Sequence, residues 1–140
     1  PYILRHIQGT PENMQDAPKY DHVVEDIAAN LALKCNRLLE EGVDDIIIDP
    51  GFGFGKTHAH NFELLRDLDY LHELGHPLLV GISRKSMIWK TLNSSAQEAL
   101  NGTTALHMFA LQKGASILRV HDVKEAIEVR TLWQQLQVKA

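Results

Sequence analysis

The sequence predicts an α/β fold in which four parallel strands alternate with helices. Segments with the period of a strand and segments with the period of an amphipathic helix alternate along the 140 residues, in steps of roughly 35 residues. Residues 44–50, DDIIIDP, are apolar at consecutive positions, which is typical of a strand buried on both faces of a parallel sheet. Glycines at positions 42, 75 and 114 end three of the helical segments. These observations favour a parallel sheet covered by helices.

The individual elements follow from periodicity, taken in chain order. We expect strands at residues 2–7, 44–49, 76–82 and 115–120, and helices at residues 21–41, 62–74, 83–92, 96–113 and 122–137. Residues 8–20 are polar and contain two prolines, so a loop is expected there. Ser95 and Glu98 have the spacing of a capping box at the start of the fourth helix. The apolar positions of the last helix fall on one face: Val123, Ala126, Ile127, Leu132 and Leu136.

Length and composition indicate one cytoplasmic domain that acts on a small molecule. The chain is 44% hydrophobic and has a net charge of -4, with acidic and basic residues well mixed. It therefore lacks the basic surface expected for binding nucleic acid or an anionic membrane. Cys35 is the one cysteine, and no apolar run approaches the about 20 residues of a membrane span. The first residues, PYILRHI, lack a signal-peptide pattern and are interpreted as a strand from a longer chain.

The functional residues are expected at the carboxyl edge of the sheet. Right-handed crossovers place every strand-to-helix loop at that edge, and these loops contain QGTPENMQ, PGFGFGKT, SRKS and HD. The pattern alone leaves open whether the sheet is an open doubly wound one or part of a (βα)8 barrel. A complete barrel needs about 250 residues, so the chain would be half of one.

The segment DPGFGFGKT, residues 49–57, is similar to a nucleotide-binding loop but fails its requirements. Pro50 stands where a P-loop needs its first glycine, and the glycine spacing does not match the dinucleotide fingerprint either. Lys56 therefore has no assigned role. The glycines would let the backbone approach a ligand, while Phe52 and Phe54 either stack on a flat ring or belong to the core.

Three groups of polar residues lie at or just after the ends of strands. Asp49 closes an apolar strand and needs donors, such as the adjacent N–H groups of an aminopyrimidinone; a helix N-cap or a loop brace is the alternative. Lys85, with neighbouring serines and helix amides, suits an anion, although simple capping would also explain these residues. Arg119 and His121 are two apart, so they project to one side and would match a pyrophosphate. The alternative is an ion pair between Arg119 and Asp122, with His121 an ordinary loop residue.

Other reactive residue types give weaker indications. His58 and His60 are close in sequence, but no third metal ligand is evident near them, and the other histidines are scattered. Cys35 falls within a helical apolar stripe, so it is not expected to be a nucleophile.

Four ordered motifs resemble the C-terminal half of dihydropteroate synthase, a (βα)8-barrel family of folate biosynthesis: PYILRHIQGTPENMQ, DPGFGFGKTHAHN, LLVGISRKSMI and ILRVHDVKEA. The resemblance implies that residues 1–140 are a partial pterin-binding domain containing strands and helices 5 to 8 of the barrel. It implies a transferase that condenses 6-hydroxymethyl-7,8-dihydropterin diphosphate with 4-aminobenzoate, releases pyrophosphate and is a sulfonamide target. It also implies a full-length homodimer that uses Mg²⁺, with the metal ligand in the N-terminal half and none in this chain.

The resemblance implies substrate-binding roles for seven residues. It implies no side chain that acts as a nucleophile or general base. By substrate group they are Asp49 and Lys85 for the pterin, Arg119 and His121 for the diphosphate, and Gly53, Phe54 and Ser86 for 4-aminobenzoate. The sequence departs from the family in two places: Arg5 stands where methionine is usual in the pterin pocket, and Trp89 stands where glycine is usual.

Two other functions stay open at this point. One is a pterin-binding methyltransferase that passes a methyl group from a methylated folate to a corrinoid; it would not need Arg119 and His121 for a diphosphate. The other is an inactive half-barrel with a structural or pairing role. An isolated half-barrel is expected to be inactive and to leave two sheet edges open, which favours dimerisation or aggregation.

Overall fold

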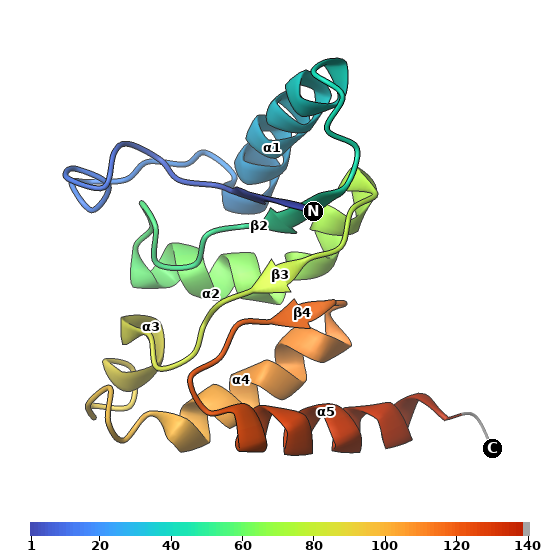
Figure 1. The fold of residues 1–140 in the computed structure, drawn as a ribbon. Helices are drawn as coiled ribbons and strands as arrows, with labels where there is room; N and C mark the ends of the chain where they lie inside the picture. Colours follow the sequence, from blue (N-terminus) through green and yellow to red (C-terminus); the bar gives the residue numbers. More distant parts are fainter. Residues whose placement is uncertain (139–140) are drawn as a thin grey trace.

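Four short parallel strands lie side by side in chain order. The computed structural model describes residues 1–138, and its strands are β1 Tyr2–Arg5, β2 Ile46–Asp49, β3 Leu79–Val80 and β4 Ile117–Leu118 (Figure 1). β1 pairs with β2 and β3 pairs with β4, and a parallel bridge between Ile48 and Leu78 joins the two pairs. The strand order is therefore β1, β2, β3, β4, and the predicted parallel arrangement is confirmed.

The strands are shorter than predicted, although their flanking residues continue the same course. The segments expected as strands at 76–82 and 115–120 pair with each other over two residues only. Backbone hydrogen bonds extend past these limits, from Ser116 N to Leu78 O and from Arg119 N to Val80 O, both at 2.9 Å. The two segments thus run alongside one another up to Arg119, the first of the two residues expected at the diphosphate.

Helices follow each strand and cover the sheet on its outside. Their bounds are α1 Val23–Glu40, α2 His58–Arg66, the 3-10 helix η1 Leu68–Leu74, α3 Ser86–Trp89, α4 Leu100–Gln112 and α5 Val123–Gln137. The core lies between the strands and α1, α2 and η1, where Ile27, Leu31, Ile48 and Leu68 are fully buried. Cys35 is buried in the same core, and burial raises the pKa of its thiol, as expected for a structural cysteine.

The predicted helix at 62–74 is wrong in its extent, because an earlier cap exists. Thr57 Oγ1 accepts a hydrogen bond from His60 N at 3.1 Å, and Thr57 N donates to His60 Nδ1 at 3.2 Å. This capping box starts α2 at His58, and the helix gives way to η1 at Asp67. Gly75 ends η1 in a left-handed conformation, as predicted.

The predicted capping box at Ser95 and Glu98 is also wrong. α4 begins only at Leu100, and no side chain caps it. The reason is a competing partner: Arg84 donates to the carbonyl oxygens of Ala96 and Gln97 at 2.8 and 2.6 Å. Both carbonyls thus bond to a side chain from another segment, and residues 97 and 98 form a turn before α4 begins.

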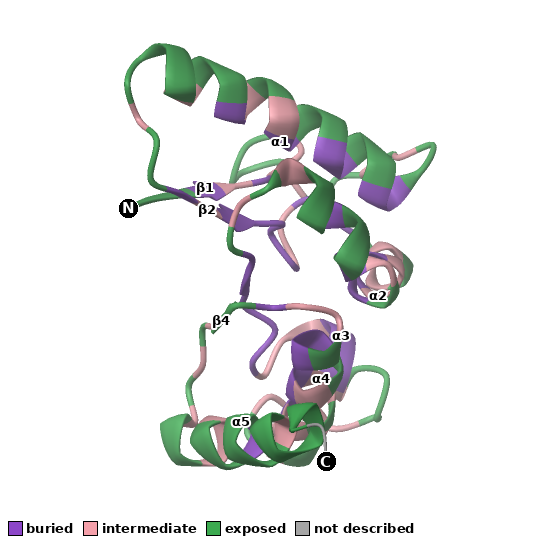
Figure 2. Ribbon diagram, turned by 90° about the vertical axis from the view of Figure 1, so that its right-hand side faces the viewer, coloured by how far each residue is buried: buried purple, intermediate pink, exposed green. Residues whose placement is uncertain are grey.

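The apolar face of α5 is uncovered among the described residues. Val129 is the one buried residue on that helix, whereas Val123, Ile127, Leu132 and Leu136 are between 47% and 66% exposed. Figure 2 shows α5 as mostly exposed. β4 has no neighbour on its outer side within residues 1–138, so nothing packs there against the helix. No helix in the same range is long and apolar enough to cross a membrane.

Candidate active site

Asp49 ends β2 as a buried carboxylate with a donor on each oxygen. Its side chain is 2% exposed. Oδ1 accepts from the Gly51 amide at 2.8 Å, and Oδ2 accepts from Arg5 Nε at 2.8 Å. The bond to Gly51 is the loop brace considered as an alternative, whereas the N-cap alternative is wrong because Thr57 caps α2. One carboxylate oxygen is thus committed to the loop and the other faces Arg5.

Lys56 holds the glycine loop from inside. Its side chain is 2% exposed, and its Nζ donates to the carbonyl oxygens of Gly51 and Phe54, both at 2.9 Å. The third partner is His6 Nδ1 at 3.1 Å. An ammonium group has three N–H donors, so all of them are used. Lys56 therefore fixes both ends of the turn that carries Gly53 and Phe54.

The pKa values of Lys56 and His6 are both strongly lowered. Burial lowers the pKa of Lys56 to about 7, with Asp49 opposing the shift and Lys85 adding to it. Burial also lowers the pKa of His6 to about 3, helped by Lys56 and Lys34. His6 is therefore neutral at ordinary pH and accepts the hydrogen bond from Lys56 through Nδ1.

The glycines of this loop serve close backbone packing. A Cβ on Gly51, which has φ of 75°, would overlap the carbonyl oxygen of His6, so the loop lies directly against the chain after β1. Phe52 is fully buried and belongs to the core. Phe54 is half-buried and lies under the Lys85 ammonium, 4.9 Å from Nζ to the ring centroid. Phe52 thus packs in the core, whereas Phe54 belongs to the candidate site.

A first cavity lies beside the glycine loop. It has a volume of about 250 Å³, and its lining residues are Met14, Phe52, Gly53, Phe54, Asn61, Lys85, Ser86 and Met87. The three residues expected at 4-aminobenzoate, which are Gly53, Phe54 and Ser86, all belong to this lining. The loop is further fixed by Asn61, whose Oδ1 accepts from Gly53 N at 2.8 Å.

A second cavity adjoins the first at the carboxyl ends of β3 and β4. It has a volume of about 320 Å³, and its lining residues are Gly81, Ser83, Lys85, Arg119, Val120 and His121. Both residues expected at the diphosphate are among them. Gly81 leaves room for Arg119, since a Cβ there would lie 2.9 Å from Nη2. The two cavities share one residue, Lys85.

Lys85 connects the two cavities. Its Nζ donates to the carbonyl oxygen of Phe52. Burial lowers the pKa of Lys85 to about 8; nearby Asp49 opposes that shift, and Arg119 and Arg5 add to it. The side chain thus lies within electrostatic reach of Asp49 on one side and of Arg119 on the other.

The loops after β3 and β4 hold each other in place. Ser83 Oγ lies 2.9 Å from His121 Nδ1 and accepts from the His121 amide at 3.2 Å. Arg84 forms a two-bond ion pair with Asp122, at 2.8 and 2.9 Å. The alternative ion pair between Arg119 and Asp122 is therefore not formed, and Arg119 faces the cavity instead. Capping does not explain Ser83 and Arg84, because no side chain caps α3 and Ser83 bonds to His121 instead.

Several residues of the site have roles that the sequence did not indicate. Lys56 and Ser83 position other groups, and Gly81 provides space for one of them. Only Lys56 could have been found in advance, because a lysine between a glycine turn and a helix cap is surrounded by free carbonyl groups. The other two depend on contacts between segments that are 38 residues apart in the chain.

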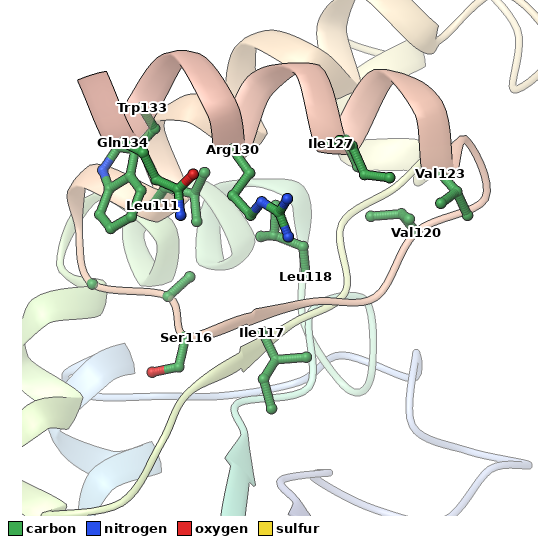
Figure 3. Close-up of a pocket in the computed structure, with 13 residues that line it drawn as sticks. Leu111, Ser116, Ile117, Leu118, Val120, Val123, Ile127, Arg130, Trp133 and Gln134 are labelled. Atoms are coloured by element: carbon green, nitrogen blue, oxygen red, sulfur yellow. The ribbon is translucent and has the colours of Figure 1, made fainter. Parts of the chain in front are cut away.

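A larger hollow than either of these cavities is a different feature. It is a groove of about 620 Å³ between β4 and α5, where Ile127, Arg130 and Trp133 project toward the segment that contains Ile117 (Figure 3). Its lining is mainly apolar and contains none of the predicted site residues. It is the gap left at the uncovered edge of the sheet, so we do not assign it to catalysis.

Metal ligands do not gather anywhere in residues 1–138. No three His, Cys, Asp or Glu side chains lie close enough together there to hold an ion. His60 takes part in the cap of α2. No third metal ligand therefore lies beside His58 and His60 in the described part of the chain.

Comparison with known proteins defines the class to which this fold and site correspond. The sequence profile described as "Pterin binding enzyme" matches residues 1–121, and the chain belongs to that family. Dihydropteroate synthase from Haemophilus influenzae is 42% identical over 136 residues, which are 96% of this chain and 50% of that protein. The chain thus spans about half the length of this relative.

Solved structures of dihydropteroate synthases match the fold closely. The Yersinia pestis enzyme, solved with a sulfonamide drug complex, has a TM-score of 0.95 at 42% identity. The match includes 98% of this chain and 51% of the Y. pestis chain. The Thermus thermophilus enzyme was solved in complex with 6HMPPP and in complex with 4-aminobenzoate. Both structures have a TM-score of 0.92 at 39% identity and match 97% of this chain, which covers 55% and 56% of those chains. The expected half of a (βα)8 barrel is therefore confirmed.

Proposed function

We propose that this chain is the C-terminal half of a dihydropteroate synthase, with residues 1–140 forming the last four βα units of the pterin-binding domain. The complete barrel would condense 6-hydroxymethyl-7,8-dihydropterin diphosphate with 4-aminobenzoate to give 7,8-dihydropteroate and pyrophosphate. The observation that carries the proposal is the pair of adjoining cavities that share Lys85. One is lined by Gly53, Phe54 and Ser86, and the other by Arg119 and His121.

The groups in and beside the two cavities suit different parts of the reaction. The pterin ring would present adjacent N–H groups to Asp49, and Lys85 would contact its carbonyl side. Arg119 and His121 would bind the diphosphate with charged and imidazole N–H donors. The aromatic ring of 4-aminobenzoate would pack on Phe54 beside Gly53, with its carboxylate near Ser86. Complexes of the T. thermophilus relative with 6HMPPP and with 4-aminobenzoate support this pairing of ligands.

The reaction would need electrostatic stabilisation rather than a side-chain nucleophile. The bond between the pterin methylene carbon and the diphosphate oxygen breaks first, and the electron pair leaves with pyrophosphate. Arg119 and His121 stabilise that charge, while Asp49 offsets the positive charge on the pterin. The arylamine nitrogen then attacks the methylene carbon and releases a proton. Lys85 lines both cavities, so it lies near the groups that act in each of the two steps.

The proposal extends to the metal, the assembly and the location of the enzyme. We expect Mg²⁺ to be bound by residues outside this chain, because the described residues offer no group of ligands for it. No step above is assigned to the metal. We also expect a homodimer in the cytoplasm, where a lone cysteine such as Cys35 stays reduced.

The geometry at β4 favours this function over the pterin-dependent methyltransferase. A methylated folate carries no diphosphate, so a methyltransferase would not need Arg119 and His121 for that group. Both residues line the same cavity as Lys85, and Gly81 leaves space for the guanidinium. Tighter binding of pterin diphosphate than of methylfolate would support the synthase, and the reverse order would favour the methyltransferase.

The proposal is tested by turnover in a complete barrel that carries this chain as its C-terminal half. Lys85→Ala and Arg119→Ala should each lower the rate of dihydropteroate formation at least about 100-fold, because each removes a charge that acts on the transition state. Lys90→Ala is the matched control, since Lys90 is exposed just past α3. Normal turnover in both site variants would contradict the assignment.

A second test uses residues 1–140 alone. This chain should form no dihydropteroate, because the proposed metal ligand and part of the pterin site lie in the other half. Measurable product from the purified chain would refute that expectation.

A further inference from the structure

The side chain of Arg5 reaches across from β1 to the carboxylate at the end of β2. Arg5 stands directly opposite Asp49 in the strand register. Its Nε lies 2.8 Å from Asp49 Oδ2, while Gly51 N occupies Oδ1. Both oxygens of the carboxylate proposed to hold the pterin therefore already have a donor.

Arg5 also covers the neighbouring aromatic ring. Its guanidinium carbon lies 4.5 Å from the centroid of Phe54, on which Lys85 also acts from 4.9 Å. A planar guanidinium stacks well on an aromatic face, and this contact adds to the ion pair with Asp49. Arg5 thus spans the space between the proposed pterin carboxylate and the ring proposed to pack on 4-aminobenzoate.

A ring that binds Asp49 must approach Oδ2, because Oδ1 is turned toward the loop by its bond with the Gly51 amide. The bond to Oδ2 from Arg5 is made by a side chain that is 35% exposed and can swing outward. The guanidinium lies between Oδ2 and the Phe54 ring, so a ring that enters this space must displace it and replace its charge-assisted hydrogen bond with another.

We propose that Arg5 is a specificity-determining residue that competes with the pterin ring for Asp49. This inference rests on the proposed function of Asp49 as the pterin-binding carboxylate. Arg5 weakens the binding of every neutral ring at that carboxylate. A ring with two adjacent donors replaces the bond from Arg5 and adds a second one, because a carboxylate oxygen can accept two hydrogen bonds, whereas a ring with one donor only replaces the bond from Arg5. Rings with a single donor are therefore selected against.

The test is the affinity for 6-hydroxymethylpterin, a ligand without phosphate, so that the charge of Arg5 does not act on a diphosphate. Titration calorimetry compares the complete barrel with its Arg5→Met variant, which keeps side-chain length but no donor. Arg5→Met should bind the pterin about tenfold more tightly. Arg5→Gln, which keeps a neutral donor, should show an intermediate increase. Arg66→Met is the control, because Arg66 is exposed on α2 and pairs only with its neighbour Asp67.

Repeating the comparison in the Asp49→Asn background shows whether the gain acts through the carboxylate. The increase caused by Arg5→Met should fall to less than about twofold there, because the competition has lost its target. A full increase in that background would overturn the inference. Equal or weaker binding in both Arg5→Met and Arg5→Gln would overturn it as well.

The failure of this inference is distinguishable from failure of the proposed function. If wild type binds the pterin but the two Arg5 variants bind it no better, the competition is refuted and the pterin site stands. If neither wild type nor any Arg5 variant binds the pterin while circular dichroism shows them folded, the pterin assignment of Asp49 is refuted, and the inference with it. Arg5→Gln keeps the test decisive if Arg5→Met fails to fold, since its amide can still donate to Oδ2.

Discussion

The loop after β2 and the loop after β4 both carry residues proposed to bind substrate, but they are held in different ways. The first is fixed by buried groups, with Asp49 and Lys56 each 2% exposed. The second is exposed at Arg119 and His121 and is held by the partly exposed ion pair of Arg84 with Asp122. A flat ring binds best to a rigid surface from which water is excluded, whereas a bound diphosphate is charged and can stay partly hydrated. The difference therefore fits the two ends of one substrate.

The two ends also border different edges of the sheet. The ring end has a packed floor, Phe52, and lies beside β1, where Arg5 stands opposite Asp49. The diphosphate end lies next to β4, and neither β1 nor β4 has a neighbour on its outer side within residues 1–138. We infer that the other half of the barrel completes the site at both ends.

The largest effect on the first loop should come from Lys56→Met. The substitution leaves the carbonyl oxygens of Gly51 and Phe54 without their donor, and each buried unpaired acceptor costs roughly 1–3 kcal/mol. Urea denaturation of the complete barrel should show a loss of about 2 kcal/mol in the free energy of unfolding, because the methionine regains some apolar burial. Lys90→Met should change it little. Equal losses in the two variants would show that Lys56 does not brace the loop.

A smaller effect concerns the pH dependence of stability through His6. The pKa of His6 is about 3 in the folded protein against 6.5 for an ordinary histidine, so the unfolded state binds a proton that the folded state refuses. Unfolding is therefore favoured progressively as the pH falls from about 6.5 toward 3. His6→Gln should flatten this part of the stability curve, measured by denaturation at pH 4 to 7. His22→Gln, at an exposed position before α1, should leave the slope as it is.

Much of the fold follows from patterns within the sequence. The consecutive apolar residues of β2, the helical stripe of α1 and the glycines at 42, 75 and 114 correspond to observed elements. The errors arise where a distant side chain competes for local groups. Arg84 takes the carbonyls that would have begun α4 early, and its partner Asp122 is 38 residues away.

In the site, too, residues that stand out in the sequence can be predicted, whereas contacts between distant segments cannot. Asp49, Phe54, Lys85 and the pair Arg119 and His121 stand out as charged or aromatic residues at or just after strand ends. The structure places Phe54, Lys85, Arg119 and His121 in the lining of two adjoining cavities, while Asp49 lies buried at the end of β2 and bonds to Gly51 and Arg5. The bond between Arg5 and Asp49 depends on the register of two strands, which the sequence does not specify. The same holds for the contact of Ser83 with His121.

The central claim is that the two ends of one substrate bind at two separate groups of this chain. It is tested most directly by measuring 6-hydroxymethylpterin and inorganic pyrophosphate binding separately in Asp49→Ala and Arg119→Ala variants of the complete barrel. We expect Asp49→Ala to weaken pterin binding about 100-fold and pyrophosphate binding less than about threefold. Arg119→Ala should weaken pyrophosphate at least about tenfold and leave the pterin nearly unchanged. Equal effects of each variant on both ligands, or no effect on either, would contradict the account.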